Sequence, residues 1–188
     1  MKFPEKYRIL NKNLFIKDNY SIVPIRFEDR YSIMTWRNEQ LYHLRQNNPL
    51  TKSIQDSYFS DIVSKIFQKN FPNQLLFSYL KDGECIGYGG LVHINWTDKN
   101  AEISFIMKTS LEKEEFYLHW NIFLQLIEEV AFNELKLHKI YIYAFDLRPH
   151  LYEVVENTGY NKEAILREHC LFEGKFIDVI IHSKINNK

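Results

Sequence analysis

The sequence predicts a mixed α/β (α+β) fold, in which a mostly antiparallel, twisted sheet has helices on both faces and one parallel pair of strands. Three neighbouring segments carry this prediction. Residues 101–107 are a short apolar run with one acid, residues 111–135 repeat apolar side chains every three to five positions, and residues 138–145 are rich in β-branched and aromatic residues. These patterns indicate a strand, an amphipathic helix and a second strand. Such a crossover joins two parallel strands.

Shorter segments around this crossover predict the rest of the sheet. Asp82-Gly83 indicates a tight hairpin, Asp29 is a candidate cap for the first helix, and Gly159 is a candidate end for the last helix. We expect one domain over residues 1–188, with residues 1–20 as a short N-terminal β extension. The expected strands are 7–10, 14–17, 21–27, 75–80, 85–95, 165–172 and 176–183, and the expected further helices are 30–44, one between 51 and 71, and 150–157.

Composition narrows the classes of function. Lys and Arg total 24, Asp and Glu also total 24, and no basic run exceeds two residues, so nucleic-acid binding is disfavoured. A hydrophobic content of 45% suffices for one core, whereas no apolar run approaches the length of a bilayer span. We therefore expect a cytoplasmic protein that does not bind membranes. Cys85 and Cys170 lack metal-ligand spacing and are expected to be reduced, structural residues.

Five segments carry a resemblance to a known family. They are Trp36-Arg37-Asn38, Cys85-Ile-Gly-Tyr-Gly-Gly-Leu91, Ala101-Glu-Ile-Ser-Phe105, Ala131-Phe-Asn-Glu-Leu-Lys-Leu-His-Lys139 and Gly159-Tyr160. Their order resembles the GNAT acyltransferase fold and in particular its RimJ/RimL-like branch. The chain is similar overall to N-acetyltransferases of nucleotide-linked amino sugars. The resemblance implies transfer of an acetyl group from acetyl-CoA to a primary amine, without a metal, on a sheet whose parallel strands splay apart.

The resemblance also implies where acetyl-CoA binds. Its pantetheine arm would pair with the exposed edge of the strand at 101–107, and its pyrophosphate would lie at the start of the long helix. The Gly-x-Gly turn of the family is replaced here by a segment that begins Glu114-Glu115, and two acids repel a pyrophosphate. Lys113 and Arg148 could supply the positive charge that the turn lacks. With these two cations, the implied cofactor-binding residues are Phe105, Ile106, Met107, Lys113, Phe116, Tyr117, Leu118 and Arg148.

Three residues are candidates for proton transfer. Glu102 is the single carboxylate in a buried strand, which makes it a candidate general base; a salt-bridged acid is the alternative. His93, on the preceding strand, could stand opposite Glu102 and relay a proton through water, or it could be a hydrogen-bonded core residue. The family's thiolate-protonating Tyr corresponds to Val155 here. Tyr152, three residues earlier on the same helix face, could reach a similar place.

The acceptor would lie against the first helix and the central strands. Trp36, Arg37 and Asn38 form a polar cluster with His43 and Arg45, and either Arg37 or Arg45 could clamp a nucleotide diphosphate; a solvated helix face is the alternative. The candidates for the wall of the acceptor pocket, which could equally fill a core, are Tyr88, Asn95 and Trp96.

Two classes of function therefore remain. The first is an N-acetyltransferase whose partner is a small-molecule amine, namely a nucleotide-linked amino sugar, with a polyamine or a protein N-terminus as further acceptors. The second is a GNAT-like binding or scaffold protein without acyl-CoA chemistry, which the missing glycines and the missing Tyr favour. A homodimer is compatible with aromatic residues on an edge strand.

Overall fold

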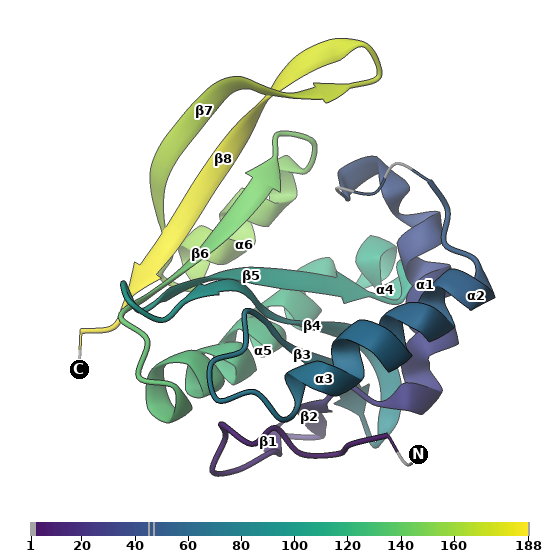
Figure 1. The fold of residues 1–188 in the computed structure, drawn as a ribbon. Helices are drawn as coiled ribbons and strands as arrows, with labels where there is room; N and C mark the ends of the chain where they lie inside the picture. Colours follow the sequence, from purple (N-terminus) through teal and green to yellow (C-terminus); the bar gives the residue numbers. More distant parts are fainter. Residues whose placement is uncertain (1–2, 45, 47, 188) are drawn as a thin grey trace.

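One eight-stranded sheet runs through the molecule in the order β1-β2-β3-β4-β5-β6-β8-β7 (Figure 1). The computed structural model describes residues 3–44, 46 and 48–187; Arg45, one of the candidate diphosphate clamps, lies outside them. All neighbouring strands are antiparallel except β5 and β6, which are parallel. The strands are β1 (Phe15–Lys17), β2 (Tyr20–Pro24), β3 (Leu75–Lys81), β4 (Glu84–Asn95), β5 (Asn100–Met107), β6 (Lys139–Phe145), β7 (Asn161–Phe172) and β8 (Lys175–Ile185).

Helices cover both faces of the sheet, which confirms the predicted layers (Figure 1). The first group, α1 to α3, lies on the face opposite α5 and α6, and β3 between the two layers is buried on both sides. No helix in the described part of the chain is both long and apolar enough to span a membrane. The helices are α1 (Arg30–Glu39), α2 (Lys52–Ser57), α3 (Ser64–Ile66), α4 (Thr109–Glu114), α5 (Phe116–Glu128) and α6 (Pro149–Asn157), with π-helical turns at Tyr58–Val63 and Glu129–Glu134 and 3-10 turns at Phe27–Asp29 and Leu41–His43.

The predicted crossover is present, but its helix is broken. Where the periodicity predicts one helix over 111–135, the backbone leaves helical geometry at Glu115 (φ −128°, ψ 28°) between α4 and α5. Apolar spacing cannot reveal this break, because Leu111 and Phe116 both keep facing the core across it. As a result, the side chain of Glu112 on α4 can reach Arg148 on the segment after β6.

The N-terminal extension differs from its prediction. Residues 7–10 form turns rather than a strand, because the Tyr7 side chain is used for packing and hydrogen bonding. The Tyr7 hydroxyl donates to the carbonyl of Leu76 (2.7 Å) and accepts from its N–H (3.1 Å), so it bridges both backbone groups of one β3 residue. Asp29 does not cap α1; its buried carboxylate binds Arg26 and the hydroxyl of Ser78.

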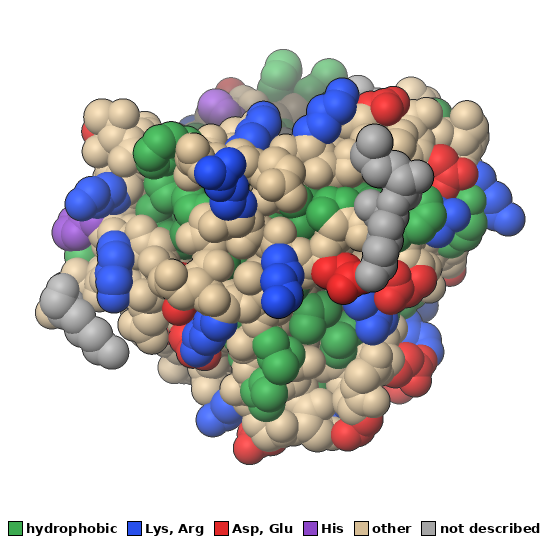
Figure 2. Space-filling model, turned by 60° about the horizontal axis from the view of Figure 1, so that its bottom comes forward, with side chains coloured by type: hydrophobic (Ala, Val, Ile, Leu, Met, Phe, Trp, Pro, Cys, Tyr) green, Lys and Arg blue, Asp and Glu red, His purple; other side chains and the backbone are tan. Residues whose placement is uncertain are grey.

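The surface carries mixed charge and an apolar outer hairpin. Lys and Arg side chains are interspersed with Asp and Glu on the face shown in Figure 2, in keeping with the balanced composition. The hairpin of β7 and β8 forms one end of the sheet (Figure 1). Leu171 is 66% exposed and Phe176 65% exposed at its tip. At the bulge of β7 near this tip, the carboxylate of Asp178 accepts from the N–H of Glu168 (2.8 Å).

Candidate active site

The two parallel strands separate and leave a gap in the sheet. β5 and β6 pair only as far as Glu102 and Tyr141, although the strands continue to Met107 and Phe145. A cavity of about 420 Å³ lies in this gap, within the usual range for small-molecule sites. Backbone groups on the facing strand edges have no strand partner there, which allows an extended ligand segment to pair with them.

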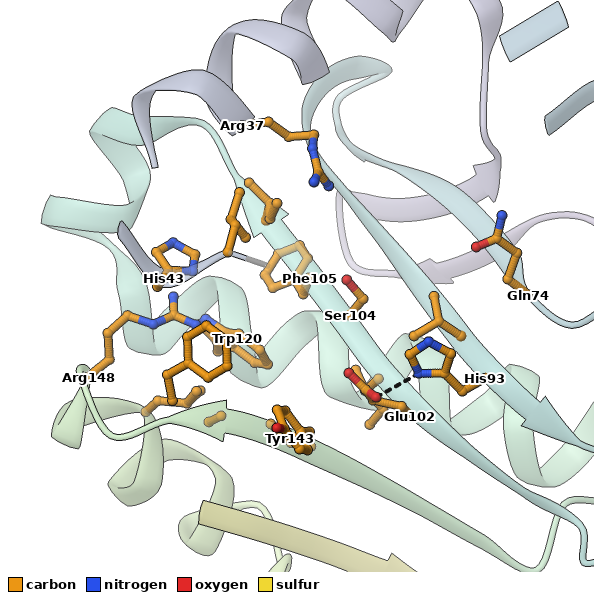
Figure 3. A pocket seen from close by; sticks show the side chains of 18 residues that line it. Arg37, His43, Gln74, His93, Glu102, Ser104, Phe105, Trp120, Tyr143 and Arg148 are labelled. Carbon is orange, nitrogen blue, oxygen red and sulfur yellow. Dashed lines mark hydrogen bonds and ion pairs between the residues drawn. The ribbon is translucent and has the colours of Figure 1, made fainter. Parts of the chain in front are cut away.

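Residues from every layer line this gap cavity (Figure 3). β4 and β5 form one wall, β6 forms the other, and Trp120 of α5 forms part of the floor. The polar and aromatic lining residues labelled in Figure 3 are Arg37, His43, Gln74, His93, Glu102, Ser104, Phe105, Trp120, Tyr143 and Arg148.

Glu102 and His93 form an ion pair or hydrogen bond at one wall of the cavity. The Glu102 carboxylate lies 2.8 Å from His93 Nδ1, and its side chain is 7% exposed whereas that of His93 is 62% exposed. A bulge in β4 near Val92 and a positive φ of 50° at His93 turn the imidazole across the strand toward Glu102. A buried carboxylate thus orients an imidazole whose other nitrogen faces water, an arrangement suited to proton relay.

Arg37 joins this cavity to a second one. The second cavity, about 310 Å³, shares Arg37, Gln74 and Ser104 with the first and is otherwise lined mainly by apolar residues of α1, α2, β3 and β4. The Arg37 guanidinium donates to the Tyr88 hydroxyl and to Gln46 (2.8 Å). No carboxylate in the described part of the chain pairs with it, and Glu102 is the single acid among the residues lining either cavity.

The opposite end of the gap cavity is held by an internal ion pair. Arg148 lies 2.9 Å from Glu112, and both side chains are about nine-tenths buried. Burial raises the pKa of the Glu112 carboxyl, although the neighbouring Arg148 guanidinium opposes the shift. Burial, with the charge of Arg148 as a second cause, lowers the pKa of His43 to about 3. His43 is therefore neutral near pH 7, with its Nε2 3.2 Å from Gln40 Oε1.

The structure gathers about half of the predicted site residues in these cavities. Glu102, His93, Arg37, Phe105, Ile106 and Arg148 line the gap cavity, and Tyr88 lines the second cavity. The contact expected between His93 and Glu102 is present. Arg148 brings its guanidinium to the gap cavity, where it pairs with Glu112.

The other predicted site residues lie elsewhere. Lys113 and Trp36 border a separate surface depression, Asn95 closes its own turn by hydrogen bonds with Thr97 and Asp98, and Trp96 donates to the Pro72 carbonyl. The rest are Met107 and Phe116, which are buried in the core, Tyr117 and Leu118, which face solvent, and Tyr152, which donates to Asp146.

The lining residues that are absent from the sequence-based set include Gln74, Ser104, Tyr143 and Phe145. Ser104 shares the strand face of Glu102, and Tyr143 and Phe145 share one face of β6 by alternation. Alternation could therefore have identified three of them once the gap between β5 and β6 was assumed. Gln74 lies in the loop just before β3 and carries no periodic signal.

An open parallel strand pair, with a carboxylate–imidazole pair on its wall, defines a class of acyl-group transferases that bind a thioester between two strands. Residues 22–181 match the model of the acetyltransferase (GNAT) domain. The chain belongs to this family and is an N-acetyltransferase that uses acetyl-CoA.

Solved structures share the fold. Spermidine N-acetyltransferase from Vibrio cholerae in complex with CoA and spermine aligns with a TM-score of 0.79 at 17% identity, over 92% of this chain and 98% of that one. Mutant forms of the spermidine/spermine N-acetyltransferase SpeG from the same organism align with a TM-score of 0.74 at 18% identity, over 90% of this chain and 95% of that one. A dodecameric structure of spermidine N-acetyltransferase from Vibrio cholerae aligns with a TM-score of 0.73 at 18% identity, over 90% of this chain and 95% of that one.

The residues of the gap fit the acyl end of acetyl-CoA. The strand edges beyond Glu102 are open, and the buried Trp120 Nε1 at the cavity floor has no hydrogen-bond partner among the described residues. At the diphosphate end the fit depends on Arg148, because the start of α5 lacks glycine and Glu115 precedes it. Among the described residues no group of three or more His, Cys, Asp and Glu could hold a metal ion.

Proposed function

We propose that the chain acetylates the primary amine of a small acceptor that carries an anionic group, and that a nucleotide-linked amino sugar is the acceptor class, as in the RimJ/RimL-like branch. The single observation that carries this proposal is Arg37. Its guanidinium borders both cavities and has no carboxylate partner in the described part of the chain. A guanidinium held by two neutral partners remains available for a phosphate or carboxylate, which it can bind through two parallel hydrogen bonds.

The second cavity supports the same acceptor class. Its apolar walls, with the hydroxyls of Tyr58 and Tyr88 and the amide of Gln74, suit a ring that has one flat face and several hydroxyl groups. The π-helical turn that starts at Tyr58 forms part of this wall. Turns of this kind are frequent at functional sites.

A polyamine is the second candidate, since the structural neighbours act on spermidine or spermine by name. The charges of the site argue against it. The second and third ammonium groups of a polyamine need carboxylates, whereas Glu102 is the single acid lining the described cavities and it already contacts His93. Arg37 would also repel a polycation.

Within this proposal Glu102 and His93 take the proton from the attacking amine. When bound, acetyl-CoA supplies the acetyl group as a thioester. Glu102 holds His93 through Nδ1, so that Nε2 accepts the amine proton directly or through one water and passes it to solvent. The 62% exposure of the His93 side chain gives that path to solvent.

The acceptor assignment is tested with Arg37→Gln, and Arg30→Gln on the same helix serves as the control because Arg30 binds Asp56 away from both cavities. We expect the KM for the nucleotide amino sugar to rise about 10- to 100-fold, as for the loss of one or two charged hydrogen bonds, and the KM for acetyl-CoA to stay within about twofold. Turnover of spermidine but not of the nucleotide amino sugar would reject the assignment in favour of the polyamine.

We also propose a homodimer through the outer hairpin. The exposed Leu171 and Phe176 on β7 and β8 would be covered by a second copy. Sedimentation of the protein beside a Leu171→Ser and Phe176→Ser double variant tests this, because the variant should be monomeric.

A further inference from the structure

A proton donor assists the departure of a thiolate, and the helix position implied by the resemblance supplies none. Val155 at that position is fully buried. Tyr152 also does not serve, because its hydroxyl donates to Asp146 (2.9 Å) and its ring stacks on His182, 5.3 Å away. Tyr152 does not line the gap cavity. The proton must therefore come from another wall of the cavity.

The lining of the gap cavity offers few donors. Glu102 and His93 form a contact with each other on β4 and β5, where they serve as the base. His43 is neutral near pH 7, has its Nε2 beside Gln40, and lies toward Arg148 at the far end of the cavity (Figure 3). Two lining residues remain that carry a hydroxyl proton at neutral pH, Ser104 and Tyr143.

Tyr143 has the position that a donor needs. The last pair between β5 and β6 is Glu102 with Tyr141, so Tyr143 is the first residue on that face of β6 after the strands separate. Figure 3 shows Tyr143 and Glu102 on the two facing strands, on opposite sides of the gap. A thioester held between these strands would have the base on one side and the phenol on the other.

We propose that Tyr143 is the general acid of the acetyl transfer, an inference that rests on the proposed function. As the amine nitrogen bonds to the acetyl carbon and the carbon–sulfur bond breaks, the Tyr143 hydroxyl gives its proton to the sulfur. The amine loses its proton through His93 and Glu102 to water, and the Tyr143 phenolate regains one from water. Starting from the ammonium form of the acceptor, one proton is released overall for each acetyl group transferred.

The outer hairpin holds the phenol in place. Cys170 Sγ on β7 lies 3.6 Å from the Tyr143 hydroxyl, and the rings of His169 and Phe145 lie 6.1 and 6.2 Å from the Tyr143 ring. Tyr143 therefore links the hairpin to the gap. Replacing it with Phe keeps these ring contacts and removes the hydroxyl, with its proton and its contact with Cys170.

The test compares Tyr143→Phe with wild type and with Tyr31→Phe, whose hydroxyl binds Asp56 outside the cavities. Thiol release is followed with whichever candidate amine the wild type accepts. We expect kcat of Tyr143→Phe to fall about 10²- to 10³-fold, while the KM for acetyl-CoA stays within threefold. The decrease of kcat at high pH, which we expect in wild type when the phenol loses its proton, should be absent from this variant. Without turnover, we expect wild type to bind CoA more tightly than CoA lacking its sulfur as pH rises, because the phenol donates to the thiolate. Tyr143→Phe should lose this difference.

The inference is overturned by any of three results: a kcat for Tyr143→Phe within threefold of wild type, an equal preference for CoA with and without sulfur in wild type, or a kcat loss with Tyr152→Phe instead. If the acceptor class alone is wrong, the nucleotide amino sugar gives no turnover in wild type, whereas the CoA-binding comparison still separates Tyr143→Phe from wild type.

Discussion

Two histidine–carboxylate pairs in this protein have almost the same separation and opposite burial. His93 and Glu102 lie 2.8 Å apart, with the carboxylate buried and the imidazole exposed. His182 and Glu156 lie 3.0 Å apart, with the His182 side chain 1% exposed and Glu156 51% exposed. The first pair borders a cavity, whereas the second ties β8 to α6. An imidazole needs contact with water or substrate to move protons. Burial, and not the distance between the partners, therefore distinguishes the pair that we propose as catalytic from the structural pair.

The largest effect should come from removing one carboxylate from each pair. Glu102→Gln should lower kcat by about 10²- to 10³-fold, because the imidazole loses the carboxylate that orients it. Glu156→Gln should leave kcat within twofold, since an exposed carboxylate contributes little. Steady-state thiol release measures both. Equal losses in the two variants would erase the distinction between the pairs.

The two histidines should show the reverse order in stability. His182→Ala removes a buried ring that stacks on Tyr152 and should cost about 2–4 kcal/mol, lowering Tm by roughly 5–10 °C. His93→Ala should cost less than about 0.5 kcal/mol because the side chain is exposed, while lowering kcat by about 10²- to 10³-fold, as for Glu102→Gln, because the group that accepts the amine proton is lost. Thermal denaturation beside kinetics gives both values, and a His93→Ala protein as unstable as His182→Ala would contradict the assignment.

A third pair, in which both partners are buried, sharpens the comparison. Glu112 pairs with Arg148, the cation that we propose for the cofactor diphosphate, so Glu112→Gln should tighten CoA binding about two- to fivefold by freeing the guanidinium. Calorimetric titration with CoA measures the change. Glu128→Gln, which frees Lys184 away from the gap cavity, is the matched control and should leave CoA affinity unchanged. Weaker binding by Glu112→Gln would show that Glu112 positions Arg148 instead.

His43 completes the series as a half-buried histidine whose ring contacts no carboxylate among the described residues. Its pKa is about 3 in the folded protein against an ordinary value of 6.5, so the unfolded chain binds more protons between these values. Stability is thus fully present above pH 6.5 and falls as the pH drops toward 3, with a slope of at most about 1.4 kcal/mol per pH unit. His43→Gln should flatten the slope in urea titrations between pH 4 and 6.5. An unchanged slope would contradict the burial of this ring.

The fold was predictable because its signals are local. Apolar spacing identified the crossover, the Asp82-Gly83 hairpin and the last two strands. The positions of Glu102 and His93 followed from one acid in an apolar strand and from strand pairing. The break at Glu115 and the Glu112–Arg148 pair did not follow, because they depend on contacts between segments that are far apart in the sequence. Asn95 and Trp96 lie outside both cavities because their side chains form local or packing hydrogen bonds, with Thr97 and Asp98 and with the Pro72 carbonyl, which the sequence pattern does not reveal.

The bridge from Tyr7 to Leu76 has a practical consequence for handling the protein. Leu76 lies in the wall of the second cavity, and the phenol oxygen engages both of its main-chain groups. Shortening the chain past Tyr7 would leave the N–H of Leu76 on an inner strand without its partner, whereas the Leu76 carbonyl would keep the N–H of Ile25 (2.9 Å). Affinity tags and fusions are therefore better joined to the carboxyl terminus, and a protease that trims the leading segment should loosen acceptor recognition before it touches the thioester gap.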